Sequence, residues 1–382
     1  GRGRRGPVRR FWNGQCGSVQ NREGNGRVTD LTRAAIRRLR VGVVPSWEFD
    51  RLSVGYEKTG RFIKLCLATL NLPGQTTPLF VRGEWGSGKT HLLSYVKAAA
   101  NLGGIAAAKV DLNARSAALN YPQRFLPAIA ENLQAFGCVG IKGIILHLLN
   151  QKELRELLLD FSCTEEAGEF GIALVDLCRR FDVEQGIDLG DHNVWNLLYG
   201  TDLCWSDHHS KRDKALSRIA SIALLCRAVG LKGLVLMLDE AETIDQLWNI
   251  RSRISAYHVL GSLFQMDAAW CVLGTTLRFD RTIAVDIENN VLSYDLGSAE
   301  APEFLRRWNR NQYQYFELPK IDSRHAKTLA GAVGSLYAAA YGHMNGVEQL
   351  IDGCLSEWNR NPSKNPRRLI RLLIHKFDLN RY

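Results

Sequence analysis

The stretch Gly83-Glu84-Trp85-Gly86-Ser87-Gly88-Lys89-Thr90 decides the fold, because it fits the phosphate-binding pattern G-x-x-x-x-G-K-[ST], the Walker A motif, at every position. Pro78–Arg82 precedes it as a short apolar run typical of a buried strand, and His91–Ala100 follows with apolar residues at helical spacing. Strand, glycine-rich loop and helix are the context that the motif requires. A chance glycine-rich turn is the alternative, and the correct flanking elements count against it. We therefore predict a nucleotide-binding loop.

The chemistry of such a loop assigns a role to each kind of residue in it. The three glycines let the backbone curl, so that successive N–H groups and the helix N-terminus face a polyphosphate. We expect Lys89 to reach the β- and γ-phosphates and Thr90 to place its hydroxyl on Mg²⁺. The predicted ligands are therefore ATP and Mg²⁺. The residues expected to contact them are Gly83, Glu84, Trp85, Gly86, Ser87, Gly88, Lys89, Thr90 and His91.

A second element, the apolar run Leu234–Leu238 followed by Asp239 and Glu240, supports the first. A continuous apolar run is typical of a central parallel strand buried on both faces. Acids at its end would lie at the carboxyl edge of the sheet, where open α/β folds bind their ligands. We expect Asp239 to hold the Mg²⁺ hydration shell and Glu240 to polarise the attacking water, as in a Walker B motif of a hydrolase. Taken alone, the two acids would be equally consistent with a helix cap.

Composition excludes several classes of protein. The chain has 382 residues, no apolar stretch long enough for a membrane helix, and no hydrophobic run behind the N-terminal arginines that would make a secretory signal. Its nine cysteines include no C-x-x-C pair, which favours a reducing cytosol over a disulfide framework or a zinc site. We expect a cytoplasmic protein of two or more domains.

Positive charge is concentrated at the N-terminus. Residues 1–40 contain eleven arginines and two acids, so that they carry +9 of the chain's net +10. We expect residues 1–28 to form a basic, disordered arm able to contact a phosphate backbone without sequence specificity. The alternative is that this stretch, which lacks an initiator Met, is not native to the protein.

The order of elements predicts an α/β fold with a parallel central sheet, a helical insertion and a C-terminal helical lid. We expect an α/β domain over residues 29–320, beginning with a helix at Thr29 or Asp30, and a lid over residues 321–382. The insertion, at about residues 113–211, is expected to be mostly helical, with Ile141–Leu159 as one amphipathic segment. A further strand, Trp270–Gly274, ends at Thr275. This order is that of AAA+ P-loop ATPases, in which a polar residue such as Thr275 senses the γ-phosphate.

Several motifs together resemble one family, the ATP-binding proteins of BREX-type phage-defence systems, a bacterial AAA+-like group. The resemblance covers about residues 30 to 378 and rests on Leu39–Pro45 with Val54-Gly55, Arg82–Leu93, Gly230–Glu242 and Asn365–Arg371. The chain departs from the pattern at Thr275-Thr276-Leu277, where a Thr-Pro pair is common. No winged-helix DNA reader is expected after the lid, so sequence-specific DNA binding is not implied.

The resemblance also implies roles for residues outside the motifs already described. Val54 and Gly55, within Leu52–Tyr56, would flank the adenine. Arg367 or Arg368 would be the lid arginine that touches the nucleotide, although a solvated helix face explains both equally well. The arginine finger that completes a neighbouring subunit's site would be Arg307 or Arg306, with Arg278 and Arg281 as competitors. Asn113 could hold Glu240 away from water, but a turn at the end of a strand is the simpler interpretation.

The sequence therefore predicts an ATP hydrolase that couples ATP binding and hydrolysis to assembly or remodelling of an anti-phage defence complex on DNA. Its expected partners are other defence-system proteins, non-specific DNA contacts and other copies of the chain. Two alternatives remain: a regulatory ATP switch or scaffold with slow hydrolysis, and a DNA loader similar to replication initiators.

Overall fold

A computed structural model of the chain describes residues 25–45, 48–55, 57–68, 77–184, 192–203, 209–289, 291, 299–361 and 364–381. Most of the expected basic arm lies outside the described residues, as does Tyr56 next to the expected adenine contact. Among the described residues, every helix is too short or too polar to cross a bilayer.

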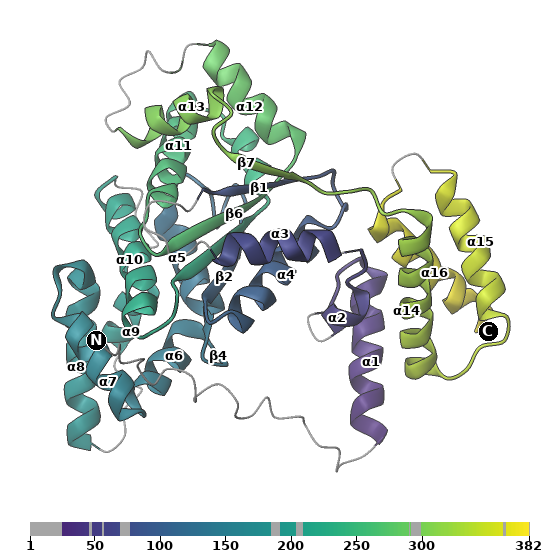
Figure 1. Cartoon of the computed structure of the whole chain (residues 1–382), viewed down its shortest axis with the longest axis horizontal. Helices are drawn as coiled ribbons and strands as arrows, with labels where there is room; N and C mark the ends of the chain where they lie inside the picture. Colours follow the sequence, from purple (N-terminus) through teal and green to yellow (C-terminus); the bar gives the residue numbers. More distant parts are fainter. Residues whose placement is uncertain are drawn as a thin grey trace, which may run out of the picture.

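The centre of the molecule is a seven-stranded sheet in the order β4-β3-β2-β5-β6-β1-β7 (Figure 1). Its parallel strands are β1 (Leu79–Arg82), β2 (Ala106–Asp111), β5 (Leu234–Asp239), β6 (Ala269–Thr275) and β7 (Gln314–Glu317). The acid-tipped strand β5 is separated from β1 by β6 alone, which pairs in parallel with both. The phosphate loop and the two acids therefore lie at the same carboxyl edge of the sheet.

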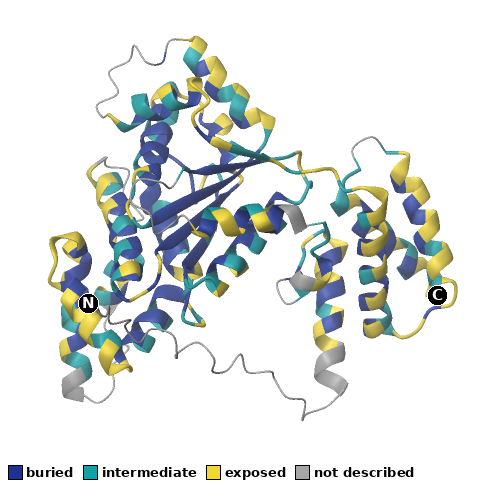
Figure 2. Ribbon diagram, viewed as in Figure 1, coloured by how far each residue is buried: buried dark blue, intermediate teal, exposed yellow. Residues whose placement is uncertain are grey.

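Helices cover both faces of the sheet, and the central strands are buried as their apolar sequences predict (Figure 2). Leu79 and Val81 of β1 pack in one core with α3 (Glu57–Ala68) and α4 (Lys89–Leu102), whereas Phe80 belongs to the larger core on the opposite face. That larger core contains residues of α5 (Pro122–Asn132), α10 (His209–Ala228), α11 (Ile250–Phe264), α12 (Leu277–Glu288) and α13 (Glu300–Asn309). The predicted α/β class is confirmed.

The inserted segment is less uniformly helical than expected. A hairpin of β3 (Gln134–Ala135) and β4 (Cys138–Val139) turns at Phe136 and Gly137, both with positive φ, and adds an antiparallel edge to the sheet. The prediction of one continuous amphipathic segment over Ile141–Leu159 is wrong. Gln151 has an extended backbone and separates α6 (Gly140–Leu149) from α7 (Lys152–Ser162). A 3-10 turn (Glu165–Ala167), α8 (Gly168–Glu184) and α9 (His192–Tyr199) complete the insertion.

The C-terminal helices form a bundle at one end of the molecule (Figure 1). They are α14 (Ser323–Tyr341), α15 (Val347–Asn359) and α16 (Pro366–Asn380). The first helix, α1, runs from Asn25 to Arg40, so it begins before the predicted Thr29. Ile36 and Leu39 of α1 join the core of the bundle, and the guanidinium of Arg40 binds the carboxylate of Asp378 at 2.7 Å. The two ends of the described chain thus pack together, which the sequence did not predict.

Candidate nucleotide-binding site

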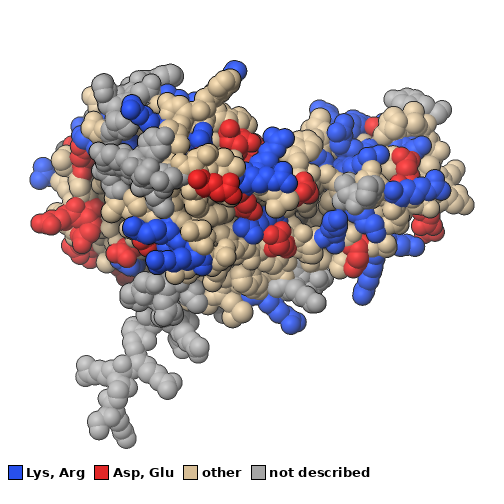
Figure 3. Space-filling model, turned by 90° about the horizontal axis from the view of Figure 1, so that it is seen from above, with Lys and Arg blue, Asp and Glu red and all other residues tan. Residues whose placement is uncertain are grey.

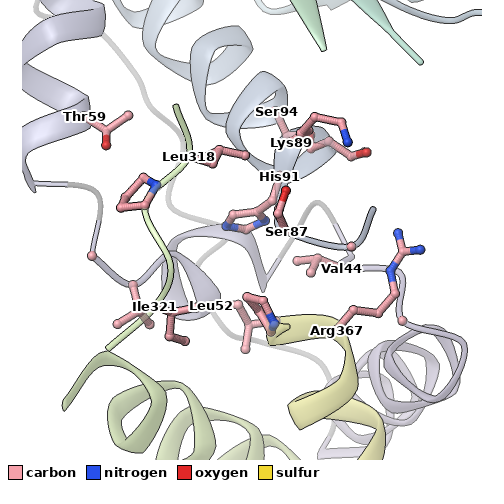
Figure 4. A pocket seen from close by; sticks show the side chains of 18 of the residues that line it. Val44, Leu52, Thr59, Ser87, Lys89, His91, Ser94, Leu318, Ile321 and Arg367 are labelled. Atoms are coloured by element: carbon pink, nitrogen blue, oxygen red, sulfur yellow. The ribbon is translucent and has the colours of Figure 1, made fainter. Parts of the chain in front are cut away.

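A cavity of about 1030 Å³ opens between the carboxyl edge of the sheet and the C-terminal bundle (Figure 4). One wall comes from the loop before α4 and the end of β5. The other wall comes from three segments: the connection between α1 and α2 (Phe49–Leu52), the connection between β7 and α14, and the start of α16. Residues remote in sequence therefore converge on one cavity, as a ligand site requires.

The backbone of the loop takes the shape that its glycines permit. Gly86 and Gly88 have φ values of 77° and 109°, and Gly88 caps the N-terminus of α4. A side chain on Gly83 would collide with the hydroxyl of Ser87. That hydroxyl is buried and has no hydrogen-bond partner among the described residues. A tight loop at a helix N-terminus with an unsatisfied hydroxyl is a suitable cradle for phosphate oxygens, so this part of the site fits ATP.

Lys89 is held inside the loop. Its side chain is 7% exposed, and its ammonium donates hydrogen bonds to the carbonyls of Gly83 at 2.9 Å and Glu84 at 3.4 Å. Burial lowers the pKa of Lys89 below its usual value, although the nearby Glu242, Asp239 and Glu240 act in the opposite direction. A buried ammonium that is held by two neutral carbonyls, with the Glu242 carboxylate 3.9 Å away, is well placed to receive the charge of a phosphate.

Asp239 lies at the end of β5 and is buried, with 2% of its surface exposed. One carboxylate oxygen accepts a hydrogen bond from the backbone N–H of Glu240 at 3.1 Å, and the other lies 3.1 Å from the ammonium of Lys109 on β2. Lys109 also binds Asp111. Burial alone would lower the pKa of Lys109, but the two carboxylates outweigh it and raise that pKa. The carboxylate expected to hold Mg²⁺ therefore has an internal counter-charge.

Two glutamates stand beside Asp239 in different environments. Glu240 is exposed, lines the cavity, and has a φ of 58°, a left-handed conformation that is strained for a residue other than glycine. Glu242 is half-buried, with one oxygen 3.9 Å from the ammonium of Lys89 and the other lacking a hydrogen bond among the described residues. Burial is the main reason that the pKa of Glu242 is raised. Thr90 lies in the same lining, so hydroxyl and carboxylate oxygens that suit Mg²⁺ are present together.

The opposite end of the cavity is apolar. Leu52 and Ile321 project into it in Figure 4, and Val44, Val54 and Gly55 belong to the same lining. The residues expected to flank the adenine therefore do line the cavity. Ser53 connects this end to the loop, because its hydroxyl lies 2.8 Å from Nε2 of His91. Burial lowers the pKa of His91 to about 4, so its ring is neutral at physiological pH.

The first turn of α16 reaches the phosphate loop. Arg367 lines the cavity and its guanidinium carbon lies 4.6 Å from the centre of the Trp85 ring, whereas Arg368 is exposed and is not part of the lining. The side chain of Asn365 donates a hydrogen bond to the carbonyl of Trp85 at 2.9 Å. Of the two arginines left open by the sequence, the structure brings only Arg367 to the site.

Other predicted residues lie outside the lining. Thr275 is fully buried, and its hydroxyl donates a long 3.5 Å hydrogen bond to the carbonyl of Val81. The four candidate finger arginines also lie outside the cavity lining: Arg278, Arg281, Arg306 and Arg307. Asn113 forms a turn, because its side-chain oxygen accepts backbone N–H groups from Arg115 to Ala117.

Sequence reasoning did not assign three residues that the structure places at the site. Lys109 lies inside an apolar strand pattern, where a lysine is unusual, and this was the available signal. Glu242 lies two residues after Glu240 in the run Asp239-Glu-Ala-Glu242. From the sequence, these two glutamates differ only in their distance from the end of the strand. Asn365 caps α16, because its side-chain oxygen accepts a hydrogen bond from the backbone N–H of Arg367 at 2.9 Å. The sequence shows such an N-cap pattern, but it does not show the contact of Asn365 with Trp85.

Comparison with known protein families shows the family to which the chain belongs. The family model described as BREX system ATP-binding protein BrxC/D matches residues 29–131 and 209–381. The match spans more than half of the chain, includes the phosphate loop, β5 and α16, and omits most of the insertion. The resemblance inferred from the motifs is therefore confirmed. No curated protein matches the chain.

Proposed function

Since the chain belongs to the family of BREX system ATP-binding proteins BrxC/D, and so is an ATP-binding protein of a phage-defence system, we propose that it is a Mg²⁺-dependent ATPase of the AAA+ type. ATP binding and hydrolysis would drive assembly or remodelling of a defence complex on DNA. The proposed place of action is the cytoplasm, and the proposed partners are other defence proteins.

One observation carries the proposal: a buried lysine in the glycine loop after β1 shares a cavity with two acids at the end of β5. Lys89, Asp239 and Glu240 all line this cavity, although 150 residues separate the lysine from the first acid. The sheet order, with β6 between β1 and β5, is that of AAA+ ATPases and supports the same assignment.

The residues divide the work as follows. The N–H groups of the loop and the ammonium of Lys89 would bind the phosphates, and Thr90 and Asp239 would hold Mg²⁺. Bound Mg²⁺ would neutralise phosphate charge that develops during transfer. Glu240 would orient a water molecule and take its proton. This role is supported by its exposure to the cavity and by the lack of an ion pair to it among the described residues. Thr275, buried between β1 and the acids, is proposed to sense the γ-phosphate through the loop.

A regulatory switch is the second candidate, and a specific observation favours it. The four candidate finger arginines lie outside the cavity lining, and Arg367 is the only arginine among the described residues that line it. The other cations of the lining are the lysines Lys89, Lys97, Lys109 and Lys320, and Lys109 is occupied by two carboxylates. Hydrolysis would then be slow until another subunit or protein adds a cation. A DNA loader similar to replication initiators would instead show turnover that rises with DNA.

The binding part of the proposal is tested with Lys89→Ala. Removal of the ammonium should weaken ATP binding about 10- to 100-fold, because a hydrogen bond to a charged group contributes about 1.5–3 kcal/mol. Isothermal titration with Mg·ATP measures this on variants whose folding is verified by circular dichroism. Lys152→Ala, at an exposed position on α7, is the matched control and should bind like the wild type. Wild-type affinity in Lys89→Ala would place ATP elsewhere.

A further inference from the structure

Trp85 is an unusual side chain for its position. It lies in the phosphate loop among glycine and serine, and its residue is 68% exposed. The exposed ring nevertheless has a partner, because the guanidinium carbon of Arg367 lies 4.6 Å from its centre. The carbonyl of the same tryptophan accepts the hydrogen bond from Asn365. Two side chains from the first turn of α16 therefore converge on one loop residue.

Two glycines pack against Asn365 and Arg367, at positions where a larger residue would collide with these side chains. A Cβ on Gly86 would lie 2.5 Å from the amide nitrogen of Asn365, and a Cβ on Gly42 would lie 2.6 Å from Cγ of Arg367. Both glycines also have positive φ, at 77° and 79°. The phosphate loop at Gly86 thus packs against Asn365, and the connection between α1 and α2 at Gly42 packs against Arg367. An arginine on a solvated helix surface would not need such close packing.

The chemistry of the stack leaves the donors of Arg367 available. A guanidinium stacked on an aromatic ring uses its face, while its five N–H groups point outward in its own plane. The Arg367 side chain has no hydrogen-bond or ion-pair partner among the described residues, yet it lines the cavity beside Gly86, Ser87 and Lys89. In Figure 4 it extends from α16 toward the loop. A planar set of unsatisfied donors next to a phosphate loop is suited to an anionic group.

We propose that Trp85 is a positioning residue: its ring holds the Arg367 guanidinium at the rim of the phosphate loop, where the guanidinium edge meets the terminal phosphate of ATP. This inference rests on the proposed function and adds to it a direct connection between the loop and the bundle. Nucleotide recognition by α16 then depends on a side chain in the loop. Trp85→Phe preserves a ring for the stack, whereas Trp85→Leu preserves only bulk.

The test is a double-mutant cycle on Mg·ATP affinity, measured by isothermal titration. Trp85→Leu should weaken ATP binding about 3- to 10-fold, the range of a partly desolvated cation–π contact, while Trp85→Phe stays within about 2-fold of the wild type. Arg367→Gln should weaken it at least as much, and adding Trp85→Leu to Arg367→Gln should cost nothing more. Binding of ADP, which lacks the terminal phosphate, should change less in every variant.

Trp248→Leu is the matched control, because Trp248 is 99% exposed and lies outside the cavity lining. It should bind ATP like the wild type. The proposal is overturned if the losses from Trp85→Leu and Arg367→Gln add, if Trp85→Phe is as weak as Trp85→Leu, or if ATP and ADP lose equally. Arg367→Lys, which keeps the charge but not the planar fork, should not restore affinity. Failure of the wild-type chain to bind ATP would overturn both this inference and the proposed function, whereas the three outcomes above leave the proposed function intact.

Discussion

At the scale of single residues, the ion pair between Asp239 and Lys109 explains how a carboxylate can be buried at the end of β5. A carboxylate that is 2% exposed needs a counter-charge, and Lys109 provides one from the neighbouring strand at 3.1 Å. Gly274 on β6 makes room on the other side, because a Cβ there would lie 2.7 Å from the Asp239 carboxylate. Three adjacent strands thus fix the position of one carboxylate.

This arrangement leads to a prediction for Lys109→Met. The substitution leaves Asp239 buried without a partner, so the free energy of unfolding should fall by about 2–3 kcal/mol, somewhat below the cost of breaking a fully buried pair because the cavity admits water. Urea denaturation measures the change, with Lys152→Met on the exposed face of α7 as the control. An unchanged urea midpoint would show that Lys109 does not compensate the charge of Asp239.

Residues in contiguous motifs could be predicted from the sequence, and residues that meet only in the fold could not. The phosphate loop, Asp239 and Glu240 were identified because each motif has fixed spacing and a local context. Lys109 contacts Asp239 because β2 pairs with β5 in a register that sets Asp111 opposite Asp239. No local sequence pattern reveals that register. The choice between Arg367 and Arg368 depends on the rotation of α16, since successive helical residues point about 100° apart.

At the scale of elements, α4 is connected to the apolar end of the cavity through the contact between His91 and Ser53. Burial lowers the pKa of His91 to about 4 from the usual 6.5. Between these two values the unfolded chain binds a proton that the folded chain does not. The stability contributed by the neutral ring is therefore complete above about pH 6.5 and is lost as the pH falls toward 4.

We therefore predict a pH dependence that disappears in His91→Gln. The His91 contribution to the free energy of unfolding should fall by about 2 kcal/mol between about pH 7.5 and pH 5, as linkage requires for this shift. Urea titrations at both pH values on the wild type and on His91→Gln give the difference, and His343→Gln, at an exposed position, is the control. The same pH dependence in wild type and His91→Gln would contradict the assignment.

Elements with long, regular patterns were predicted more accurately than short ones. The apolar runs of β5 and β6 were recognised because burial on both faces removes polar residues from a central strand. The hairpin of β3 and β4 was missed because strands of two residues carry no measurable alternation, and its turn uses Phe136 at a positive φ instead of a typical turn residue. The break at Gln151 was missed because the apolar periodicity continues from Leu148 to Leu158 across it.

At the scale of the whole molecule, packing of α1 on the C-terminal helices brings positive charge to one end. Residues 321–382 carry nine Lys and Arg against five Asp and Glu, and the sequence of α1 adds five arginines against one acid, Asp30. On the face shown in Figure 3, basic side chains gather over the end formed by this bundle. The arginine-rich residues 1–24 lie outside the described residues, and their contact with DNA stays a prediction.

Assembly of several copies is the second prediction at this scale. Arg278 is exposed beside Asp245, Arg306 is paired with Glu303, and Arg307 lies over the ring of Tyr313, so each lies outside its own chain's cavity lining. If one of them acts as a finger in a neighbouring site, specific activity should rise with protein concentration. Arg307→Ala, or the equivalent change at the active position, should reduce turnover while ATP affinity is kept.

Mixing two variants distinguishes an arginine finger that acts in a neighbouring subunit from an effect of the substitution within its own chain. An arginine variant combined with Lys89→Ala should regain part of the activity, because each chain supplies the half-site that the other lacks. Arg310→Ala, at the exposed position that directly follows α13, is the matched control and should turn over ATP like the wild type. Activity that is independent of concentration and insensitive at Arg278, Arg281, Arg306 and Arg307 would rule out a finger supplied by this chain.

The central claim is that the chain hydrolyses ATP with Glu240 as the residue that activates water. Its most direct test is steady-state phosphate release from Mg·ATP by the wild type and by Glu240→Gln, with and without duplex DNA, together with ATP affinity for both. We predict many turnovers by the wild type, unchanged ATP affinity in Glu240→Gln, and a rate reduced at least about 100-fold, as expected for loss of a general base. Equal and negligible phosphate release by the two proteins, with ATP bound by both, would contradict hydrolysis and establish the regulatory switch instead.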